Sequence, residues 1–457
     1  MKRLLLYIVI IKDNIKIYNR FNGGVIVSNF RKIRPCQYVV LCFLVITLVG
    51  SILLSLPISH VDEMQVHFID ALFTAASAVC VTGLNVIDTA THFNLFGRCI
   101  IAILIQIGGL GVTSIGAAFI LISQRKFGIR QRIRLKEEFN IDRLGGVVRL
   151  VKSVFKMTII IEVIGLILNF IVFSRDYPFW SALGFSAFHT ISAFNNAGFD
   201  IFGEFQNLTP YQDSFLLKLT TIGLIFSGGF GFVSLSEIYQ KRNYKKLSMN
   251  TKIIIVMSIY LLAIGAVLLK ITEGFSWMDA LFFSTSARTA GFTTIEIGTF
   301  SQTGLLIIMV LMFIGASPGS TGGGIKITTF FTILMSLKGI STNTPVTAFK
   351  RRIPADSIIK AFSIFTLVIS INAINTFLIL LVQPELPFLD VLFEVVAAMA
   401  TVGLSTGITP QLNLYSKLII CITMFIGRLG TLTVASIWSY RAAATTFNYP
   451  EEKVTIG

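Results

Sequence analysis

The sequence predicts an all-α polytopic membrane protein, built from four tandem helix–pore helix–filter–helix repeats with pseudo-fourfold symmetry around a central pore. Its composition is 54% hydrophobic and 13% charged, whereas soluble chains average about 25% charged residues. Long charge-poor segments recur along the chain. Between them, a short apolar segment that ends in a glycine occurs four times, and these glycines are Gly83, Gly198, Gly291 and Gly403.

Eight segments are candidate membrane-spanning helices, because each approaches or exceeds the roughly 17–25 residues that such a helix needs. They form four pairs, and one glycine segment lies between the members of each pair. The candidates are 38–56, 99–123, 157–173, 219–236, 253–269, 304–337, 361–383 and 418–440. An apolar stretch at 4–11 is too short to span and lacks the features of a cleavable signal sequence.

Basic residues collect in alternate loops. Lysine and arginine are concentrated in 1–34, 124–156, 239–252 and 338–360, whereas the loops between these are acidic or neutral. By the positive-inside rule the basic loops, and with them both termini, are cytoplasmic. The net charge of +15 is therefore a sign of topology. Nucleic-acid binding is not expected, because it would need a basic face on a soluble domain.

These features divide the chain into four pore repeats that are joined by cytoplasmic loops. The parts are a cytoplasmic N-terminal segment (1–34), pore repeat 1 (35–123), a cytoplasmic basic loop (124–153), pore repeat 2 (154–238), a second basic loop (239–251), pore repeat 3 (252–337), a cytoplasmic loop (338–358), pore repeat 4 (359–440) and a cytoplasmic C-terminal tail (441–457). The expected location is the cell membrane, with the lipid bilayer around the repeats.

Each glycine segment begins with an apolar, helix-like stretch that is too short to cross a membrane and return. These stretches are 70–79, 180–194, 277–286 and 388–399. Non-helical backbone at membrane depth is tolerated only where it is buried in protein or lines a water-filled cavity. A re-entrant pore helix followed by an extended filter strand fits that constraint. The negative end of the helix dipole would then favour a cation, and strand carbonyls could replace the hydration shell of that cation.

One glycine segment alone is weak evidence, but four copies in register indicate a pore. The alternative is a secondary, ion-coupled cation transporter, in which inverted repeats and broken helices form a site at the midplane. The repeats here share one orientation, which favours the pore. An enzyme is not expected, because the sequence has no recognisable nucleophile–base pair and its five cysteines show no metal-ligand spacing.

The four filter segments also carry specific motifs. They read Val81-Thr-Gly-Leu84, Asn195-Asn-Ala-Gly-Phe199, Arg288-Thr-Ala-Gly-Phe292 and Thr401-Val-Gly-Leu404, and they are accompanied by a glycine-rich stretch at 315–326 and by Gly427-Arg-Leu-Gly430. With these motifs, the chain resembles the ion-translocating subunit of the Trk/Ktr/HKT potassium transporter superfamily and is similar to its bacterial Ktr type. The resemblance extends over residues 35–440.

The resemblance implies which residues form the filter and which ion they bind. The implied filter residues are Val81, Thr82, Gly83, Asn196, Ala197, Gly198, Thr289, Ala290, Gly291, Thr401, Val402 and Gly403. Sodium-selective plant relatives have serine at the first filter glycine, so Gly83 implies a preference for K⁺. K⁺ is then the transported ion, and no organic cofactor is expected in this chain. The backbone argument alone does not separate K⁺ from Na⁺.

The second helix of the third repeat is interrupted. Glycine and proline recur between positions 315 and 324, and such a run does not hold an unbroken helix. The stretch is either a kink in a packed helix or a flexible loop below the filter. The resemblance implies a gating loop made of Gly315, Ala316, Ser317, Pro318, Gly319, Ser320, Thr321, Gly322, Gly323, Gly324 and Lys326.

Arg428 lies midway along the last apolar segment, too deep for its charge to reach the membrane surface easily. Intramembrane charges are functional candidates by default. The resemblance implies that this arginine projects into the pore beneath the filter, as a barrier to cations. The alternative is a scaffold role, in which Arg428 satisfies helix-end carbonyls of the pore helices. We expect structural pairing or capping for Glu394, Arg288 and His189, and we expect Glu162 to face a neighbouring helix.

The sequence shows no soluble regulatory domain. The resemblance implies a homodimer of two separate pores and a separate cytoplasmic partner, a Rossmann-like nucleotide-binding regulatory ring. Such rings bind ATP or ADP, and in some relatives cyclic dinucleotides. The basic loops and the tail at 441–457 would form the docking surfaces for this ring. The resemblance leaves open a dependence of uptake on Na⁺, and coupling to Na⁺ or H⁺ does not follow from the sequence.

Overall fold

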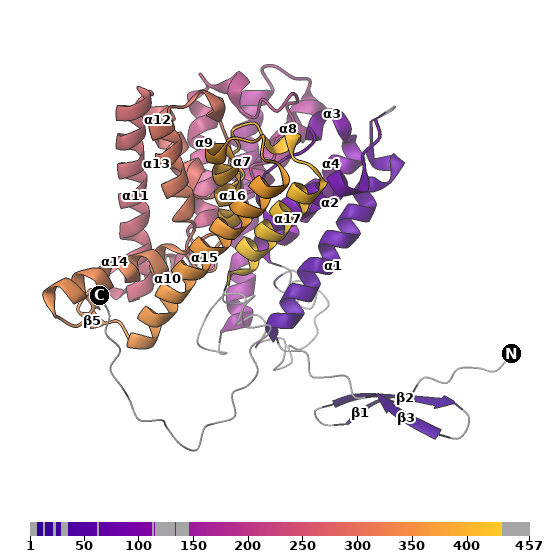
Figure 1. Cartoon of the computed structure of the whole chain (residues 1–457), viewed down its shortest axis with the longest axis horizontal. Helices are drawn as coiled ribbons and strands as arrows, with labels where there is room; N and C mark the ends of the chain where they lie inside the picture. Colours follow the sequence, from indigo (N-terminus) through magenta and orange to yellow (C-terminus); the bar gives the residue numbers. More distant parts are fainter. Residues whose placement is uncertain are drawn as a thin grey trace.

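A long helix, a short helix, an extended segment with a glycine, and a second helix follow one another four times along the chain (Figure 1). The computed structural model describes residues 7–11, 14–21, 24–28, 35–61, 64–111, 114, 133 and 146–431. The helices pack into one bundle, and the short helices lie inside it. The predicted polytopic helical fold with four repeats is therefore confirmed.

The first helix of each repeat is long and apolar enough to cross a bilayer. These helices are α1 (Pro35–Ser55), α7 (Val147–Phe173), α11 (Met249–Glu273) and α15 (Ala355–Val382). Among the described residues, they are the four helices that qualify as single spans. They carry many exposed leucine, isoleucine and valine side chains. Large exposed apolar surfaces of this kind mark contact with a membrane or a partner, so the protein is a multi-pass membrane protein.

The short helices are the predicted pore helices. They are α2 (Phe68–Cys80), α8 (Phe179–Phe194), α12 (Trp277–Thr289) and α16 (Phe388–Ala400). Each packs against the first helix of its own repeat. Each also contains a buried phenylalanine at nearly the same distance before the filter glycine, and these residues are Phe73, Phe188, Phe282 and Phe393. The part of each short helix that leads to the filter glycine is therefore buried inside the bundle.

The second helices are shorter than the spans that the sequence predicts. They are α4 (Leu95–Leu110), α9 (Phe215–Gly229), α13 (Gln302–Phe313) and α17 (Leu414–Leu429). In the second repeat, α9 meets α10 (Phe232–Lys241) at a bend of 95°. The candidate span at 219–236 is therefore interrupted by this bend and is not one continuous helix. Most of 112–123 and all of 432–440 lie outside the described residues.

A glycine accounts for the end of three of these helices. Gly111, Gly231 and Gly430 follow α4, α9 and α17 with φ angles of 87°, 91° and 86°. This left-handed region is open to glycine and ends a helix. In the third repeat, the glycine-rich loop separates α13 from α14 (Ile327–Thr342). The interruption that we expected only in the third repeat thus has a counterpart in every second helix.

Two ion pairs join neighbouring repeats. Lys417 of α17 donates to Asp70 of α2, with an Nζ–Oδ1 distance of 2.6 Å, and links repeat 4 to repeat 1. Lys218 of α9 pairs with Asp279 of α12 and links repeat 2 to repeat 3. Both aspartates lie in the first turn of a pore helix, where a negative charge also suits the helix dipole. The pairs therefore hold repeat 4 beside repeat 1 and repeat 2 beside repeat 3, at the level where the pore helices begin.

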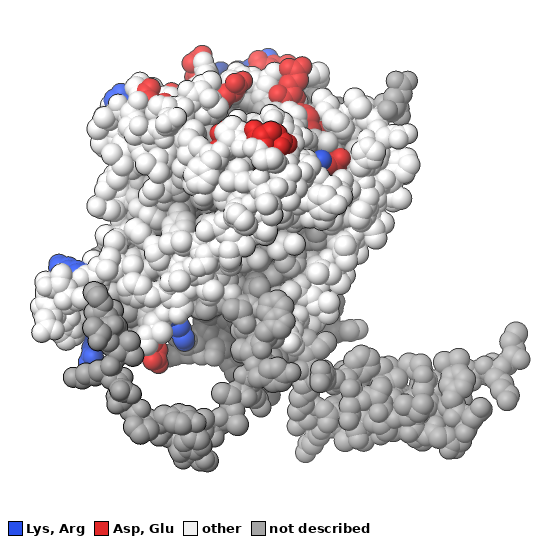
Figure 2. All heavy atoms as spheres, in the orientation of Figure 1, with Lys and Arg blue, Asp and Glu red and all other residues white. Residues whose placement is uncertain are grey.

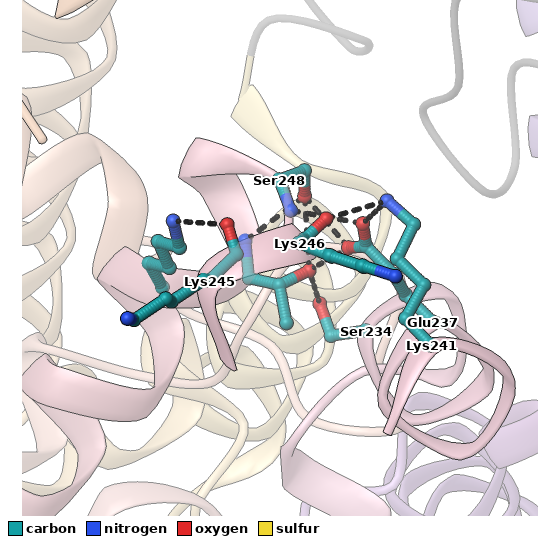
Figure 3. Close-up of polar contacts among 8 residues, drawn as sticks. Ser234, Glu237, Lys241, Lys245, Lys246 and Ser248 are labelled. Atoms are coloured by element: carbon teal, nitrogen blue, oxygen red, sulfur yellow. Dashed lines mark hydrogen bonds and ion pairs between the residues drawn. The ribbon is translucent and has the colours of Figure 1, made fainter. Parts of the chain in front are cut away.

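The bent half-helix α10 is held by Glu237 against the start of α11 (Figure 3). The Glu237 carboxylate accepts hydrogen bonds from the hydroxyl (2.7 Å) and the backbone N–H (2.9 Å) of Ser248, the residue that caps α11. It also accepts from Thr251 and forms an ion pair with Lys241 at 2.5 Å. The second helix of repeat 2 is in this way joined to the first helix of repeat 3.

Charges separate to the two ends of the bundle. Figure 2 shows most of the visible aspartate and glutamate gathered at the upper end, where α12 begins, together with some lysine or arginine, whereas the lower end beside α14 shows mainly lysine and arginine. A broad belt of other residues lies between them on this face. This distribution is typical of a protein whose middle zone contacts lipid.

The remaining elements are short. The first three strands form an antiparallel sheet in the order β1-β2-β3, and β4 pairs with β5. These elements are β1 (Tyr7–Ile11), β2 (Asn14–Phe21), β3 (Gly24–Ser28), β4 (Thr347–Ala348), β5 (Arg351–Arg352), α3 (Thr89–His92), and the 3₁₀ turns η1 (Pro57–Ser59), η2 (Thr209–Tyr211), η3 (Tyr244–Lys246), η4 (Ile297–Thr299) and η5 (Thr409–Gln411). The sequence analysis did not anticipate either sheet.

Candidate cation filter and the loop beneath it

The pore helices end in a turn that feeds an extended strand. In three repeats a residue just after the pore helix has a left-handed backbone: Val81 (φ 56°) and Thr401 (φ 50°) directly follow α2 and α16, and Asn196 (φ 60°) is the second residue after α8. The filter glycine follows two residues later, again with positive φ in all four repeats: 93° at Gly83, 68° at Gly198, 73° at Gly291 and 82° at Gly403. A residue with a side chain would be strained at each glycine. The strands therefore depend on glycine for their shape.

Each filter glycine lies directly against the backbone of the next repeat. A Cβ atom built on any of them would come within 3.0 Å of a carbonyl oxygen, closer than real Cβ atoms approach. The glycine–carbonyl pairs are Gly83 with Ala197, Gly198 with Ala290, Gly291 with Val402, and Gly403 with Thr82. The contacts run from repeat 1 to 2, 3, 4 and back to 1, so they close a ring. We call this arrangement the carbonyl ring.

The carbonyl ring brings together four backbone oxygens from segments far apart in the sequence. They belong to Thr82, Ala197, Ala290 and Val402, and each lies one residue before a filter glycine. Rings of backbone carbonyls can replace the hydration shell of a cation. The pore helices add to this, because the negative end of each helix dipole lies next to the strand that follows it. Eight of the twelve predicted filter residues thus lie in the carbonyl ring, and each of the other four, Val81, Asn196, Thr289 and Thr401, directly precedes one of the ring carbonyl residues.

Polar side chains next to the filter strands form hydrogen bonds that link the strands to one another and to the surrounding helices. The side chains of Asn196 and Thr289 are hydrogen-bonded at 2.9 Å, which links the strands of repeats 2 and 3. The amide of Asn195 donates to Gln106 (2.7 Å), and Gln106 donates to Glu162 (2.9 Å). Glu162 on α7 therefore faces a neighbouring helix, α4, as we expected. This chain of hydrogen bonds reaches from a spanning helix to the filter.

The second helices press against the pore helices through glycine. A Cβ atom on Gly108, Gly228 or Gly427 would collide with the carbonyl of Val79, Phe194 or Met399, in the last turn of the pore helix of the same repeat. In the third repeat, the corresponding Gly315 instead meets the carbonyl of Gly323 within the loop. The third repeat therefore departs from the symmetry at the point where the sequence predicts a gate.

The loop at 315–326 is anchored to repeat 2. The N–H of Ser317 donates to the carbonyl of Gly229 (3.1 Å), and the N–H of Phe232 donates to that of Gly319 (2.9 Å). Both partners lie at the break between α9 and α10. The bend in the second helix of repeat 2 thus supplies backbone groups that hold the loop.

The loop also touches the inner ends of two filter strands. The N–H of Gly323 donates to the hydroxyl of Thr401 at 2.9 Å, where the fourth strand begins. Gly322 packs against the side chain of Thr289, where the third strand begins. The loop therefore lies immediately below the carbonyl ring.

Arg428 connects three repeats beneath the ring. Its guanidinium donates to the carbonyl of Thr321 in the loop and to those of Gly108 and Gly109 at the end of α4, the last at 3.1 Å. A cation suits the C-terminal end of a helix. In the scaffold alternative we expected Arg428 to bind carbonyls of the pore helices, whereas the carbonyls that it binds belong to the second helix α4 and to the loop. The sequence alone could not identify these acceptors, because they lie in other repeats.

Other charged or polar groups lie close to the loop and the filter. The ammonium of Lys326 donates to the carbonyl of Gly322 at 2.7 Å and folds the end of the loop back on itself. Arg288 is buried in the last turn of α12 and lines a small cavity together with Ser258 and Gly315. His189 is hydrogen-bonded to Thr221 at 2.9 Å, the structural pairing that we expected.

A helical bundle in four repeats, closed around a ring of backbone carbonyls, defines a multi-pass membrane protein that handles cations. Comparison with known proteins identifies the family. The family model for TrkH, described as cation transport protein, matches residues 30–269 and 251–440. The chain belongs to the TrkH family of cation transport proteins, a family of transporters and not of enzymes. The resemblance to this family, which the filter motifs of the chain predict, is confirmed.

Individual relatives align along nearly the whole chain. The potassium/sodium uptake protein NtpJ of Enterococcus hirae is 35% identical over 93% of this chain and 98% of its own length. The Ktr system potassium uptake protein B of Bacillus subtilis is 36% identical over 93% of this chain and 97% of its own. The crystal structure of the potassium transporter TrkH from Vibrio parahaemolyticus superposes with a TM-score of 0.71 at 18% identity, over 92% of this chain and 87% of that one.

The close contact of Gly83 with Ala197 leads to a prediction about selectivity. Gly83→Ser would place a side chain against the carbonyl of Ala197 and strain a backbone with φ of 93°. We expect a lower ratio of K⁺ to Na⁺ uptake in the variant, because the displaced carbonyl no longer fits one ion size. The preference is measured as the ratio of K⁺ to Na⁺ uptake in a host that lacks its own K⁺ uptake systems.

Gly184→Ser is the matched control, because a Cβ atom on Gly184 of α8 meets no atom within 4 Å. It should leave the ratio at the wild-type value. An unchanged ratio in a well-folded Gly83→Ser variant would contradict the prediction.

Proposed function

We propose that this chain takes up K⁺ across the cell membrane through a channel-like pore whose selectivity filter is the carbonyl ring. The single observation that supports the proposal is the closed set of glycine–carbonyl contacts, since it surrounds one axis with backbone oxygens from all four repeats. The Bacillus subtilis relative named as a potassium uptake protein supports it, and the Enterococcus hirae relative named as a potassium/sodium uptake protein supports cation uptake. K⁺ is then the transported ion.

We assign three roles to the site residues predicted from the sequence. The filter consists of the strand residues at 81–83, 196–198, 289–291 and 401–403. The loop at 315–326 is the gate, because it lies directly below the carbonyl ring and is held by hydrogen bonds that a small movement would break. Arg428 is a barrier to cations at the level of this gate, and its bond to Thr321 couples the two.

The proposal also covers assembly and topology. The chain forms a homodimer with two separate pores, and a cytoplasmic nucleotide-binding ring regulates it. Ktr systems, to which several relatives belong by name, fit this arrangement. Both termini and the basic loops face the cytoplasm, in agreement with the separation of charge in Figure 2. We retain the division into four pore repeats and cytoplasmic loops as part of the proposal, with repeats 2, 3 and 4 beginning at α7, α11 and α15, a few residues before the starts predicted from the sequence.

A secondary, ion-coupled cation transporter is the second candidate. The breaks in the second helices favour it, because discontinuous helices form the ion sites of many such transporters. The two candidates differ in how transport responds to a second ion gradient.

Rubidium uptake into proteoliposomes tests the proposed function. We expect the purified protein to carry Rb⁺, a K⁺ analogue, down its own gradient, and excess K⁺ but not Na⁺ should compete with it. A channel-like pore needs no second gradient, so Rb⁺ uptake should occur without Na⁺. Uptake that appears only with an imposed Na⁺ or H⁺ gradient would favour the ion-coupled transporter, and empty liposomes serve as the control.

Substitution of Arg428 separates a charge barrier from a tether. At an effective dielectric near 20, two unit charges about 6 Å apart repel by roughly 3 kcal/mol, which slows one step about a hundredfold. Arg428→Gln should therefore raise Rb⁺ flux per folded protein, whereas Arg428→Lys keeps the charge and should leave flux low. Equal increases in Rb⁺ flux in both variants would instead show that Arg428 limits flux through its hydrogen bond to Thr321 and not through its charge. Lower flux together with lower thermal stability in detergent would leave Arg428 as scaffold.

A further inference from the structure

The fourth filter strand lacks a support that the first and third strands have. In repeat 1, the N–H of Gly83 donates to the hydroxyl of Ser77 at 3.0 Å. In repeat 3, the hydroxyl of Ser286 donates to the carbonyl of Phe292 at 2.6 Å. Both serines lie in the last turn of a pore helix. At the corresponding positions of α16, counted back from the filter glycine, stand the alanines Ala397 and Ala398.

A carboxyl group takes the place of the missing hydroxyl. Glu394 on α16 is 1% exposed. Its Oε1 accepts hydrogen bonds from the hydroxyl of Ser405 and from that of Thr409, the latter at 3.0 Å. The hydroxyl oxygen of Ser405 in turn accepts from the N–H of Gly407 at 2.9 Å. The four groups form one network that fixes the chain directly outside the fourth filter strand.

This carboxyl group is particular to the fourth repeat. The corresponding pore-helix positions in repeats 1, 2 and 3 are Thr74, His189 and Phe282. The hydroxyl of Thr74 donates to the carbonyl of Asp70 in its own helix (2.8 Å), and His189 is bonded to α9. Neither of these hydrogen bonds reaches a filter strand. Among the described residues, therefore, this pore-helix position is hydrogen-bonded to the chain beyond the filter glycine in repeat 4 alone.

Stability alone does not explain a carboxyl group at this place. The second oxygen of Glu394, Oε2, has no hydrogen-bond partner among the described residues. A buried polar atom without a partner costs free energy on folding, more so in a charged group. The benefit of Glu394 must lie in what Oε1 holds. What it holds is Ser405, two residues beyond Gly403.

We propose that Glu394 is a positioning residue for the selectivity filter. By holding Ser405 it fixes Gly403, whose contact with the carbonyl of Thr82 closes the carbonyl ring between repeats 4 and 1. Loss of the hydrogen bond lets this junction widen. Discrimination between K⁺ and Na⁺ then falls, whereas transport itself continues. The inference rests on the proposed K⁺ uptake function.

Three variants test the inference in proteoliposomes by the ratio of Rb⁺ to Na⁺ uptake per folded protein. Glu394→Leu removes both oxygens and should lower the ratio about tenfold, the usual effect of one lost hydrogen bond to a charged group. Glu394→Gln keeps an acceptor oxygen and should restore the ratio nearly to the wild-type value. Ser405→Ala removes the other partner without touching the buried carboxyl, so it should lower the ratio as much as Glu394→Leu.

Thr74→Val is the matched control, because it changes the same helix position in repeat 1 and should leave the ratio unchanged. If Glu394→Leu does not fold, Ser405→Ala decides alone. A wild-type ratio in Ser405→Ala, or an equal loss in Glu394→Gln and Glu394→Leu, would overturn the positioning role. Wild-type protein that shows no preference for Rb⁺ would instead contradict the proposed function itself.

Discussion

The contacts between each filter glycine and the backbone of the next repeat are the constraint on which the rest of the structure depends. At membrane depth, backbone groups must find partners in the protein or in a water-filled cavity, and extended strands provide few partners of their own. Four strands can meet this demand together by lying around one axis with their carbonyls close to one another. The approach is so close that a side chain at Gly83, Gly198, Gly291 or Gly403 has no room. The pore helices, the second helices and the ion pairs then hold the strands from outside.

The supports around the ring are less symmetric than the ring itself. Ion pairs link repeat 2 to 3 and repeat 4 to 1, through Lys218 and Lys417. In the third repeat a longer, glycine-rich loop under the strands separates α13 from α14, and Arg428 of α17 binds carbonyls of this loop and of α4. The symmetric carbonyl ring can keep one coordination geometry for the ion. Because the supports differ between repeats, a signal can still act on one repeat without changing the others. This combination fits a pore that opens through one loop.

Much of the fold could be predicted from the sequence, because charge-poor segments and basic loops reflect the bilayer and not the details of packing. The filter segments could be found as well, since their glycines recur in register. The breaks in α4, α9 and α17 were missed, because an apolar run reads alike whether its helix is straight or bent. Gly111, Gly231 and Gly430 were the available signal.

The partners of the charged residues could not be predicted in the same way. Arg428 is bonded to Gly108 and Thr321, which lie in other repeats and far away in the chain. The role of Glu394 became visible only through its bond to Ser405. Sequence patterns locate such residues, whereas the contacts that give them a function depend on how the repeats pack.

Diffraction from crystals soaked in Tl⁺, a K⁺ analogue with a strong anomalous signal, tests most directly whether the carbonyl ring is a cation site. The expected result is an anomalous peak on the axis of the ring, within coordination distance of the carbonyl oxygens of Thr82, Ala197, Ala290 and Val402, and its loss when excess K⁺ is added. A strong peak elsewhere in the protein, with none between these four oxygens, would contradict the central claim.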